Sequence, residues 1–302
     1  RYITQRTFCK AWHEGKIFRA SRPNNWCVDC GTTIADAEIE YHFDKSNIYQ
    51  IMFKIEKTDE SIVIATTRPE LIPSCESIIF HPSDSRYSHL NGKYAVTPLF
   101  NKLVPIKMHR EADPNFGTGI MMICAYGDRS DVKILREFGI TNPKTVINPD
   151  GRLNEVAGIY QGFTVEEAMK AILKDLKKNG LLIDSTKISH RIPVCWRSKT
   201  PIEIISMDEY YLKQVEVLSE LEELVNEIDF FPISNKIILD NWIKAITIDW
   251  AISRRRFYGT SIPIWYCPKC DAPNVPNENE IKRYYEAWHE KSPILNCSQC
   301  KA

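Results

Sequence analysis

Two segments of the sequence carry polar side chains where they could bind and activate a small substrate. In the first, residues 65–70 read Ala-Thr-Thr-Arg-Pro-Glu and follow the β-branched run at residues 62–64. Such a run predicts a buried strand, so two hydroxyls, a guanidinium and a proline-fixed turn follow a strand end. An ordinary capped turn, with Thr66 or Thr67 as N-cap and Glu70 in the first helical turn, is the alternative.

The second segment combines glycines with carboxylates. Gly117-Thr118-Gly119 precedes an apolar strand, and glycines let the backbone come close to a ligand. Asp128 and Asp131 follow that strand at the expected start of a helix. Asp131 is the better candidate to bind a cationic group of a substrate. For Asp128, a helix cap is as good an interpretation as a functional role.

The ten cysteines are spaced for metal binding rather than for a disulfide scaffold. Cys267-x-x-Cys270 and Cys297-x-x-Cys300 are two knuckles separated by 26 residues. Each knuckle places two thiolates on one tight turn, and two such turns complete a tetrahedral four-cysteine zinc site. We expect a structural role, because nothing in the pattern indicates an open coordination position.

Length and charge limit the classes of protein that fit. A chain of 302 residues can form two or more hydrophobic cores. Its 39 basic and 39 acidic residues cancel, which excludes a general polyanion binder and leaves RNA contacts to local patches. We find neither a signal peptide nor an apolar run of membrane-spanning length. We therefore interpret the chain as part of a larger cytoplasmic enzyme, and we expect a monomer.

The hydrophobic pattern predicts many short strands followed by alternating strands and helices. Strands at regular spacing indicate a barrel, and the later alternation fits part of a parallel α/β sheet. Thr164 and Glu167 form a capping box at the start of one helix, which Asn179-Gly180 ends. The expected strands are 48–55, 76–80, 93–97, 103–107 and 202–205, and the other expected helices are 131–138, 218–228 and 235–246.

Taken together, the threonine-rich and glycine–aspartate segments resemble the editing domain of class Ia aminoacyl-tRNA synthetases, where such segments line one hydrolytic pocket. Residues 22–27 and 34–41 resemble the lead into that domain, and 193–203 resemble its exit. Residues 249–256, followed by Tyr258-Gly259, resemble the family's DWCISRQRxxG segment. The Gly-Asp-x-x-Asp form and the Arg-Ser-Lys-Thr-Pro exit favour the valine-specific branch of archaeal type over the isoleucine and leucine branches.

This resemblance implies a mixed α/β fold, in which a β-barrel-rich editing domain is inserted between pieces of a Rossmann-type α/β core and a zinc ribbon is added. Residues 1–37 would be a remnant of the catalytic core with a zinc knuckle, and 38–190 the editing domain. Residues 191–265 would form an incomplete second part of the core, and 266–302 the zinc ribbon.

The resemblance also implies a reaction, namely hydrolysis of the ester between threonine and the 3′ ribose of tRNA(Val). The expected catalytic residues are Asp131, Asp128 and Thr67, with Asp131 holding the α-ammonium group. Phe116 would stack on the terminal adenine, although a core aromatic is nearly as good an interpretation. The expected substrate-binding residues are Thr66, Arg68, Glu70, Phe116, Gly117, Thr118 and Gly119.

Some residues depart from the family pattern or fall outside this reaction. Met122 and Cys124 stand where bacterial relatives typically carry Lys and Thr, so recognition of the threonine hydroxyl must differ in detail. By the same resemblance, the three arginines at 254–256 would border the aminoacylation site of the intact enzyme, and a structural role is the favoured interpretation within this chain. The ATP-binding signatures of class I are absent from this sequence, so ATP and Mg would act only in the full-length enzyme.

A third knuckle, Cys27-x-x-Cys30, has two possible completions. In the family a second CxxC often lies at the domain exit, where this sequence has Cys195 but Ser198. Three thiolates with His190 would make a zinc site of three cysteines and one histidine, and an empty, degenerate site is the alternative. Two other functions stay open for the whole chain. One is an isoleucyl or leucyl editing domain, and the other is a non-catalytic, zinc-stabilised RNA-binding module.

Overall fold

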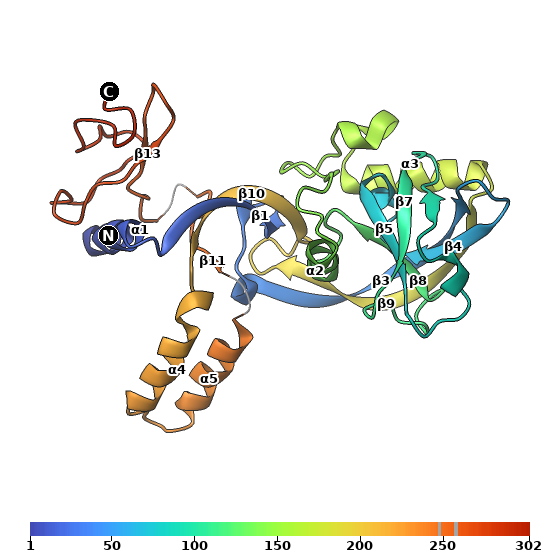
Figure 1. The fold of residues 1–302 in the computed structure, drawn as a ribbon, viewed down its shortest axis with the longest axis horizontal. Coiled ribbons are helices and arrows are strands. Elements are labelled where there is room, and N and C mark those ends of the chain that lie inside the picture. The colour runs from blue at the N-terminus through green and yellow to red at the C-terminus, as the bar shows by residue number, and fades with distance from the viewer. Residues whose placement is uncertain (247–248, 257–258) are drawn as a thin grey trace. The chain divides into compact units, whose positions relative to one another are not determined.

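The computed structural model describes residues 1–246, 249–256 and 259–302, so Tyr258 of the predicted core segment lies outside the described residues. The chain forms two compact units (Figure 1). One unit comprises Arg1–Arg22 with Met207–Ala302, and the other is Pro23–Ser206. The predicted division into four parts stays a prediction.

The Pro23–Ser206 unit contains a seven-stranded sheet in the order β4-β3-β6-β7-β5-β8, with β9 paired to β3. β5 and β7 are parallel, and the other described pairs of this sheet are antiparallel. β4 and β8, at the two ends of this order, contact each other, so the sheet curls into a half-barrel. Its strands are β3 (Ile39–Ile55), β4 (Ser61–Thr66), β5 (Cys75–Phe80), β6 (Tyr94–Val96), β7 (Leu103–Met108), β8 (Ile120–Cys124) and β9 (Leu182–Cys195).

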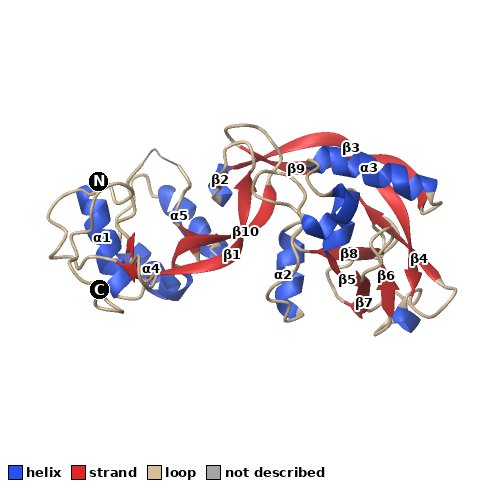
Figure 2. Cartoon of the chain, turned by 90° about the horizontal axis from the view of Figure 1, so that it is seen from above, coloured by secondary structure: helices blue, strands red, loops and turns tan. Residues whose placement is uncertain are grey.

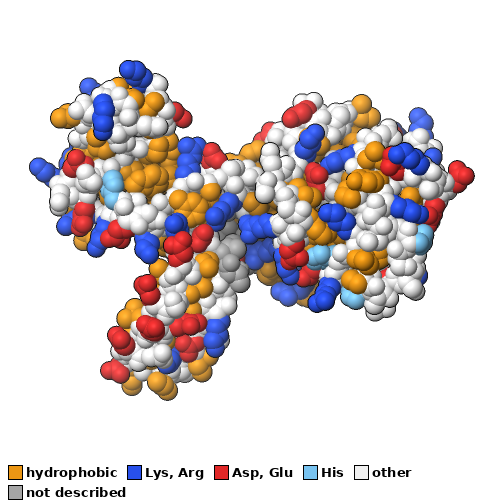
Figure 3. Space-filling model, in the orientation of Figure 1, with side chains coloured by type: hydrophobic (Ala, Val, Ile, Leu, Met, Phe, Trp, Pro, Cys, Tyr) orange, Lys and Arg blue, Asp and Glu red, His pale blue; other side chains and the backbone are white. Residues whose placement is uncertain are grey.

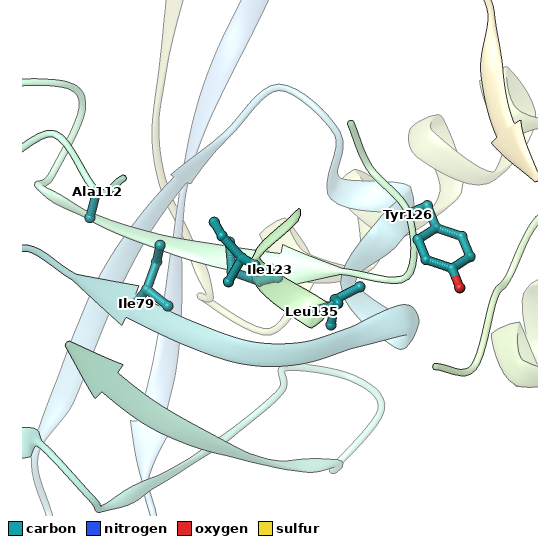
Figure 4. Close-up of a cluster of buried hydrophobic side chains, with 6 residues drawn as sticks. Ile79, Ala112, Ile123, Tyr126 and Leu135 are labelled. Atoms are coloured by element: carbon teal, nitrogen blue, oxygen red, sulfur yellow. The ribbon is translucent and has the colours of Figure 1, made fainter. Parts of the chain in front are cut away.

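The core consists of apolar side chains at alternate positions of these strands. Ile51, Phe53 and Ile64 are buried on β3 and β4, and burying each such side chain stabilises the fold by about 1.5–3 kcal/mol. The helix α2 (Arg129–Glu137) covers β5 and β8. Figure 4 shows its Leu135 beside Ile79 and Ile123 from those two strands, within the buried cluster Ile79, Ala112, Ile123, Tyr126, Ile134 and Leu135.

The second helix of this unit, α3 (Val165–Lys178), forms as the sequence predicts. Thr164 and Glu167 make the reciprocal capping box, and the chain leaves the helix at Asn179 before Gly180 adopts φ +68°. Its buried stripe includes Ile172 and Leu176. Figure 2 shows α3 lying along the curled sheet.

The most extended feature of the unit is a two-stranded ribbon that the sequence did not indicate (Figure 1). β3 and β9 pair from Ile39 opposite Cys195 to Gln50 opposite Asp184, before the register shifts. The predicted strand 48–55 is therefore only the second half of β3.

The other unit consists of helices and short strands around small cores. One buried cluster contains Cys9, Ile264, Val275 and Ile281. The chain also forms a sheet in the order β11-β10-β1-β2, and the boundary between the units falls within β1 and β10. The described pair of β10 with β11 is antiparallel, which differs from the parallel sheet predicted for residues 191–265. β12 and β13 also pair antiparallel, at and beyond the end of that region.

The remaining elements are short. The helices are α1 (Tyr2–His13), α4 (Leu218–Glu227) and α5 (Asn235–Ala245). The strands are β1 (Ile17–Cys27), β2 (Thr32–Thr33), β10 (Glu203–Leu212), β11 (Trp250–Ala251), β12 (Trp265–Tyr266) and β13 (Pro273–Asn274). Turns of 3-10 helix span Asp36–Glu38, Pro69–Ser74, Ser88–Leu90, Glu155–Tyr160 and Val215–Val217.

The surface fits the balanced composition. Basic and acidic side chains are interspersed on the face that Figure 3 shows. Among the helices that the structure describes, none is both long and apolar enough to span a membrane.

Candidate functional site

The threonine-rich and glycine–aspartate segments meet at one edge of the half-barrel. Gly117 has φ +58°, and a Cβ atom there would lie 2.6 Å from the Cβ of Ala65 at the end of β4. A side chain cannot fit between these backbones, so glycine is needed both for its conformation and for the close approach. The sequence therefore brings the two predicted segments into direct contact.

Polar contacts hold the glycine loop from outside. The Tyr87 hydroxyl donates to the Thr118 carbonyl at 2.7 Å, and Arg86 Nη2 donates to the Pro114 carbonyl at 2.9 Å. Arg86 is in turn paired with the buried carboxylate of Asp84. Phe116, at the tip of this loop, is 62% exposed, so the structure does not place it in the core.

Asp131 lies where β8 passes into α2, and it is only 5% exposed. Its Oδ2 accepts hydrogen bonds from the amides of Gly127 at 2.9 Å and Cys124 at 3.2 Å. Among the described residues, Oδ1 accepts no hydrogen bond, and it is not among the fully enclosed atoms. The carboxylate is thus fixed by one oxygen and offers the other to a donor from outside.

The protonation of Asp131 is set by its surroundings. Burial, followed by the nearby charge of Asp128, raises the pKa of Asp131 to about 7, against the opposing effect of the backbone amides. Asp128 is exposed and accepts a hydrogen bond from the Asp131 amide at 2.9 Å. It is the N-cap of α2, as one of the two interpretations of the sequence predicted.

The Thr-Thr-Arg-Pro-Glu turn is held by internal bonds. Thr66 Oγ1 accepts from the Arg68 amide at 3.0 Å, so this hydroxyl caps the turn. Arg68 Nε donates to Glu70 Oε1 at 2.7 Å, and Nη2 donates to both oxygens of Glu203 at 3.0 and 2.8 Å. Thr67 is partly buried at the bend between them.

One cation, Arg68, faces two buried carboxylates, those of Glu70 and Glu203. Burial opposes the charge of Arg68, but Glu203 and Glu70 outweigh that effect and raise its pKa. Burial raises the pKa of Glu70, although Arg68 acts in the opposite direction. Glu70 Oε2 is buried and has no hydrogen-bond partner in the described part of the chain. The three groups fix the strand end to residue 203, at the start of β10.

The thiols of this region are not activated. Cys124 lies opposite Cys75 on neighbouring strands, and both are buried. A hydrogen bond with Cys75, with burial, raises the pKa of Cys124 well above its ordinary value. Met122 is also buried, so at these two positions the site presents apolar or unionised sulfur.

The four C-terminal cysteines come together as predicted. Their sulfur atoms all lie within 4.8 Å of one another. Backbone amides of Cys300 and Gln299 lower the pKa of Cys297 to about 6, and the amides of Lys269 and Cys270 lower that of Cys267. The Ala272 amide lowers the pKa of Cys270, but burial and the neighbouring thiols outweigh that effect and raise this pKa to about 12. Four sulfur atoms this close, two of them stabilised as thiolates by amides, fit a zinc ion, which would cross-link the two turns.

The second group of thiols contains Cys27, Cys30 and Cys195, whose sulfur atoms also lie within 4.8 Å of one another. Ser198 Oγ is 3.2 Å from Cys27 Sγ, so a hydroxyl stands where a fourth thiolate would complete the tetrad. His190 is outside the group. It lies five positions before Cys195 on β9, and its Nδ1 contacts Ser46 Oγ at 3.0 Å.

A separate cavity of about 1430 Å³ lies in the unit formed by residues 1–22 and 207–302. The three arginines at 254–256 and several aromatic side chains line it. Arg254 donates to the Ala251 carbonyl at 2.6 Å, and Arg255 donates to the Asp208 carbonyl at 3.1 Å.

Comparison with known proteins decides the family. The family model for class I tRNA synthetases specific for I, L, M and V matches residues 2–295. The chain is 42% identical over 301 residues to the valine–tRNA ligase of Pyrobaculum aerophilum, covering 100% of this chain and 37% of that protein. The chain belongs to the class I tRNA synthetases.

Two further archaeal valine–tRNA ligases match this synthetase chain over almost all its length. That of Aeropyrum pernix is 43% identical over 302 residues, covering 100% of this chain and 36% of the relative. That of Nanoarchaeum equitans is 44% identical over 298 residues, covering 99% and 39%. The chain therefore spans somewhat more than a third of the length of these relatives.

Within this class I synthetase chain, the structure adds residues that sequence reasoning missed. Glu203 had no assigned role, although a single carboxylate beside the apolar residues 202, 204 and 205 is a signal that a buried cation pairs with it. Asp84 and Arg86 had no assigned role either, and nothing in the sequence connects them to the glycine loop.

Proposed function

We propose that the Pro23–Ser206 unit hydrolyses the ester of a mischarged aminoacyl-tRNA, with threonyl-tRNA(Val) as its substrate. The geometry of Asp131 carries this proposal. Two backbone amides hold one oxygen of a buried carboxylate, and the second oxygen is left for an outside donor. An α-ammonium group is such a donor, and a charge-assisted bond to it is short and strong.

The need for a second site follows from the size of the two amino acids. A hydrophobic pocket rejects an isostere that adds a hydroxyl by only about a hundredfold, and the valine enzyme is itself the established example of this limit. A hydrolytic site must therefore recognise the hydroxyl. The exposed carboxylate of Asp128 lies beside Asp131 and can accept that hydroxyl or orient the attacking water.

Water is the nucleophile in this proposal. Cys124 is the thiol beside Asp131, and its raised pKa keeps it protonated and a poor nucleophile at neutral pH. An ester is activated relative to an amide and needs less general-base assistance. Asp131 and Asp128, with Thr67 at the bend after β4, are the residues to which we assign contact with the reacting groups.

The rest of the predicted set divides into two roles. The peptide groups of residues 117–119 and the exposed ring of Phe116 suit the ester carbonyl and the terminal base. Arg68 and Glu70 are occupied by each other and by Glu203, so we assign them the role of positioning the strand end rather than touching the ester.

Metals and nucleotides have separate places in this proposal. The C-terminal group of four cysteines would hold a structural zinc, and the Cys27–Cys30–Cys195 group a second one with weaker coordination. Aminoacylation with ATP and Mg, and most contacts to tRNA, belong to the longer enzyme.

The substrate assignment is tested by deacylation of threonyl-tRNA(Val), and of tRNA(Ile) and tRNA(Leu) esters carrying their common misacylations. We expect the threonyl ester to be cleaved fastest. Faster cleavage of a tRNA(Ile) or tRNA(Leu) ester would instead identify an isoleucyl or leucyl editing domain. Binding of all three tRNAs without cleavage of any ester would instead indicate a non-catalytic RNA-binding module.

A further inference from the structure

The two faces of the β3/β9 ribbon differ sharply in charge. Residues directly opposite each other in an antiparallel pair project to the same face, and alternate residues project to opposite faces. The register of β3 with β9 therefore assigns each side chain to a face. One face, called here the outer face, carries Tyr41, Phe43, Lys45, Asn47 and Tyr49 from β3, and Ser185, Lys187, Ser189, Arg191 and Pro193 from β9.

The outer face contains cations and no carboxylate. Lys45, Lys187 and Arg191 are exposed, and within the described residues none of them forms an ion pair. The acids of the same strands, Glu40, Asp44 and Asp184, all project to the opposite face. A chain with no net charge thus concentrates three cations on one strip, which is the local patch that a polyanion needs.

Aromatic rings alternate with these cations. Phe43 is 77% exposed and Tyr41 is 50% exposed, although both lie in regular strand. The Arg191 guanidinium lies over the Tyr41 ring, 4.5 Å from its centroid. Exposed rings on a strand, interleaved with Lys and Arg, form a stacking platform for unpaired bases with cations for the phosphates between them.

The outer face leads directly to the candidate site. Tyr49 pairs with Ser185 on one side and with Thr66 on the other, so Thr66 projects to the same face. Beyond Tyr49, the alternate residues Ile51 and Phe53 are buried in the half-barrel. From Phe43 to Tyr49 the strand covers about 20 Å at 3.3 Å per residue.

From this arrangement we propose that the outer face of the ribbon is a track for single-stranded RNA, which leads the unpaired 3′ end of a tRNA to the site at Thr66. The inference rests on the proposed function for the identity of the RNA. A second copy of the chain fits this face poorly, because a two-fold contact would bring its own cations together. A protein partner would have to bury the three cations or supply matching carboxylates.

The test measures binding of uncharged tRNA, which requires no chemistry. The probes are fluorescently labelled tRNA(Val) and the same tRNA trimmed of its unpaired 3′ nucleotides. The track variant combines Lys45→Ala, Lys187→Ala and Arg191→Ala in the 302-residue chain. Its control combines Lys174→Ala, Lys177→Ala and Lys178→Ala, which removes the same charge from exposed positions on α3. Circular dichroism confirms that each variant is folded.

We expect the track variant to bind full-length tRNA at least about tenfold more weakly than wild type. The slope of log affinity against log salt concentration should also fall by about 2, because each of the three lost phosphate contacts contributes about 0.7. Trimmed tRNA should bind wild type and track variant equally, and the α3 control should match wild type on both probes. Phe43→Ala alone should weaken binding of full-length tRNA by about tenfold with the salt slope unchanged.

Three results would overturn the track. The first is wild-type affinity of the track variant for full-length tRNA, and the second is an equal loss for full-length and trimmed tRNA. The third is a dimer of the wild type that the track substitutions dissociate, which would assign the face to a second copy. Asp131→Ala should bind uncharged tRNA like wild type. Loss of deacylation with an intact track would therefore count against the proposed function alone.

Discussion

The Gly127 amide donates to Asp131 Oδ2 at 2.9 Å, and a Cβ atom at Gly127 would lie 2.5 Å from the same oxygen. The contact is closer than any side chain permits, so residue 127 determines where the carboxylate can lie. The spacing Gly-Asp-x-x-Asp thus has a physical reason, since the glycine admits the second aspartate and the first aspartate caps its helix.

We therefore predict that Gly127→Ala displaces the carboxylate and lowers the deacylation rate by about a hundredfold, the scale on which a 1 Å misplacement acts. Gly139→Ala is the control, because Gly139 follows the same helix and a Cβ there meets no atom within 4 Å. The control has φ +71°, so it should cost about 1–2 kcal/mol of stability and leave the rate unchanged. Equal rates for the two variants would contradict the assigned geometry.

The pH dependence of deacylation should follow Asp131. Because its pKa is raised to about 7, the carboxylate that binds an ammonium group forms only as the pH approaches 7. After subtraction of spontaneous hydrolysis, kcat/KM should rise between pH 5 and 7 in a single-proton step. Asp128→Asn keeps a good helix cap but removes the charge that helps to raise this pKa, so its profile should move to lower pH. An unshifted profile would show that Asp131 does not control the step.

The same group affects stability. The folded-state pKa of Asp131 is raised from 3.8 to about 7, so the folded chain holds this proton more tightly than the unfolded chain. Its stabilising contribution is complete below about pH 4 and is lost as the pH rises to about 7. In urea titrations, Asp131→Asn should gain stability relative to wild type over this range. A constant difference between the two proteins would contradict the raised pKa.

Removing Arg68 should be costly to the fold. Arg68→Met leaves Glu70 and Glu203 buried without their cation, and breaking a buried pair in this way costs about 3–5 kcal/mol. The control, Lys133→Met, breaks an exposed, solvent-screened pair with Glu111 and should leave the free energy of unfolding almost unchanged. Urea unfolding of the Pro23–Ser206 unit measures both, and similar losses would mean that the arginine is not structural.

The hydroxyl in the second thiol group offers a test of metal binding. Ser198→Cys places a fourth sulfur beside Cys27, Cys30 and Cys195, which would complete a tetrahedral set of ligands. Because even partners outside the ligand set change metal affinity by about 10–100-fold, a direct ligand should raise zinc affinity by at least about tenfold. Chelator competition, with zinc counted per chain, follows the change. Ser130→Cys adds an exposed thiol elsewhere on the surface and should leave the affinity unchanged. If both variants behave alike, the three thiols are not a metal site.

Local signals in the sequence predicted the elements that depend on neighbouring residues. The capping box of Thr164 and Glu167 located α3, and the β-branched run before Thr66 located β4. The Cys spacing predicted the C-terminal tetrad. The capping box and the β-branched run depend on residues a few positions apart in the chain. The two CxxC pairs lie further apart, but paired cysteines at this spacing most often bind a metal.

The features that the sequence did not predict depend on distant partners. The first half of β3 alternates Tyr41 and Phe43 with polar residues, but both rings are exposed, so no core holds this part of the strand and it depends on pairing with β9. The partner of Arg68 lies 135 positions away, and no local pattern shows it. The boundaries of the two units fall within β1 and β10, where the hydrophobic pattern does not change.

The central claim is that Asp131 belongs to a site that removes threonine from tRNA(Val). The most direct measurement is hydrolysis of threonyl-tRNA(Val) beside valyl-tRNA(Val) by wild type and Asp131→Ala, with zinc content and folding verified for both proteins. We predict selective cleavage of the threonyl ester by wild type and its loss in the variant. Cleavage of the threonyl ester at an equal rate by both proteins would contradict the account.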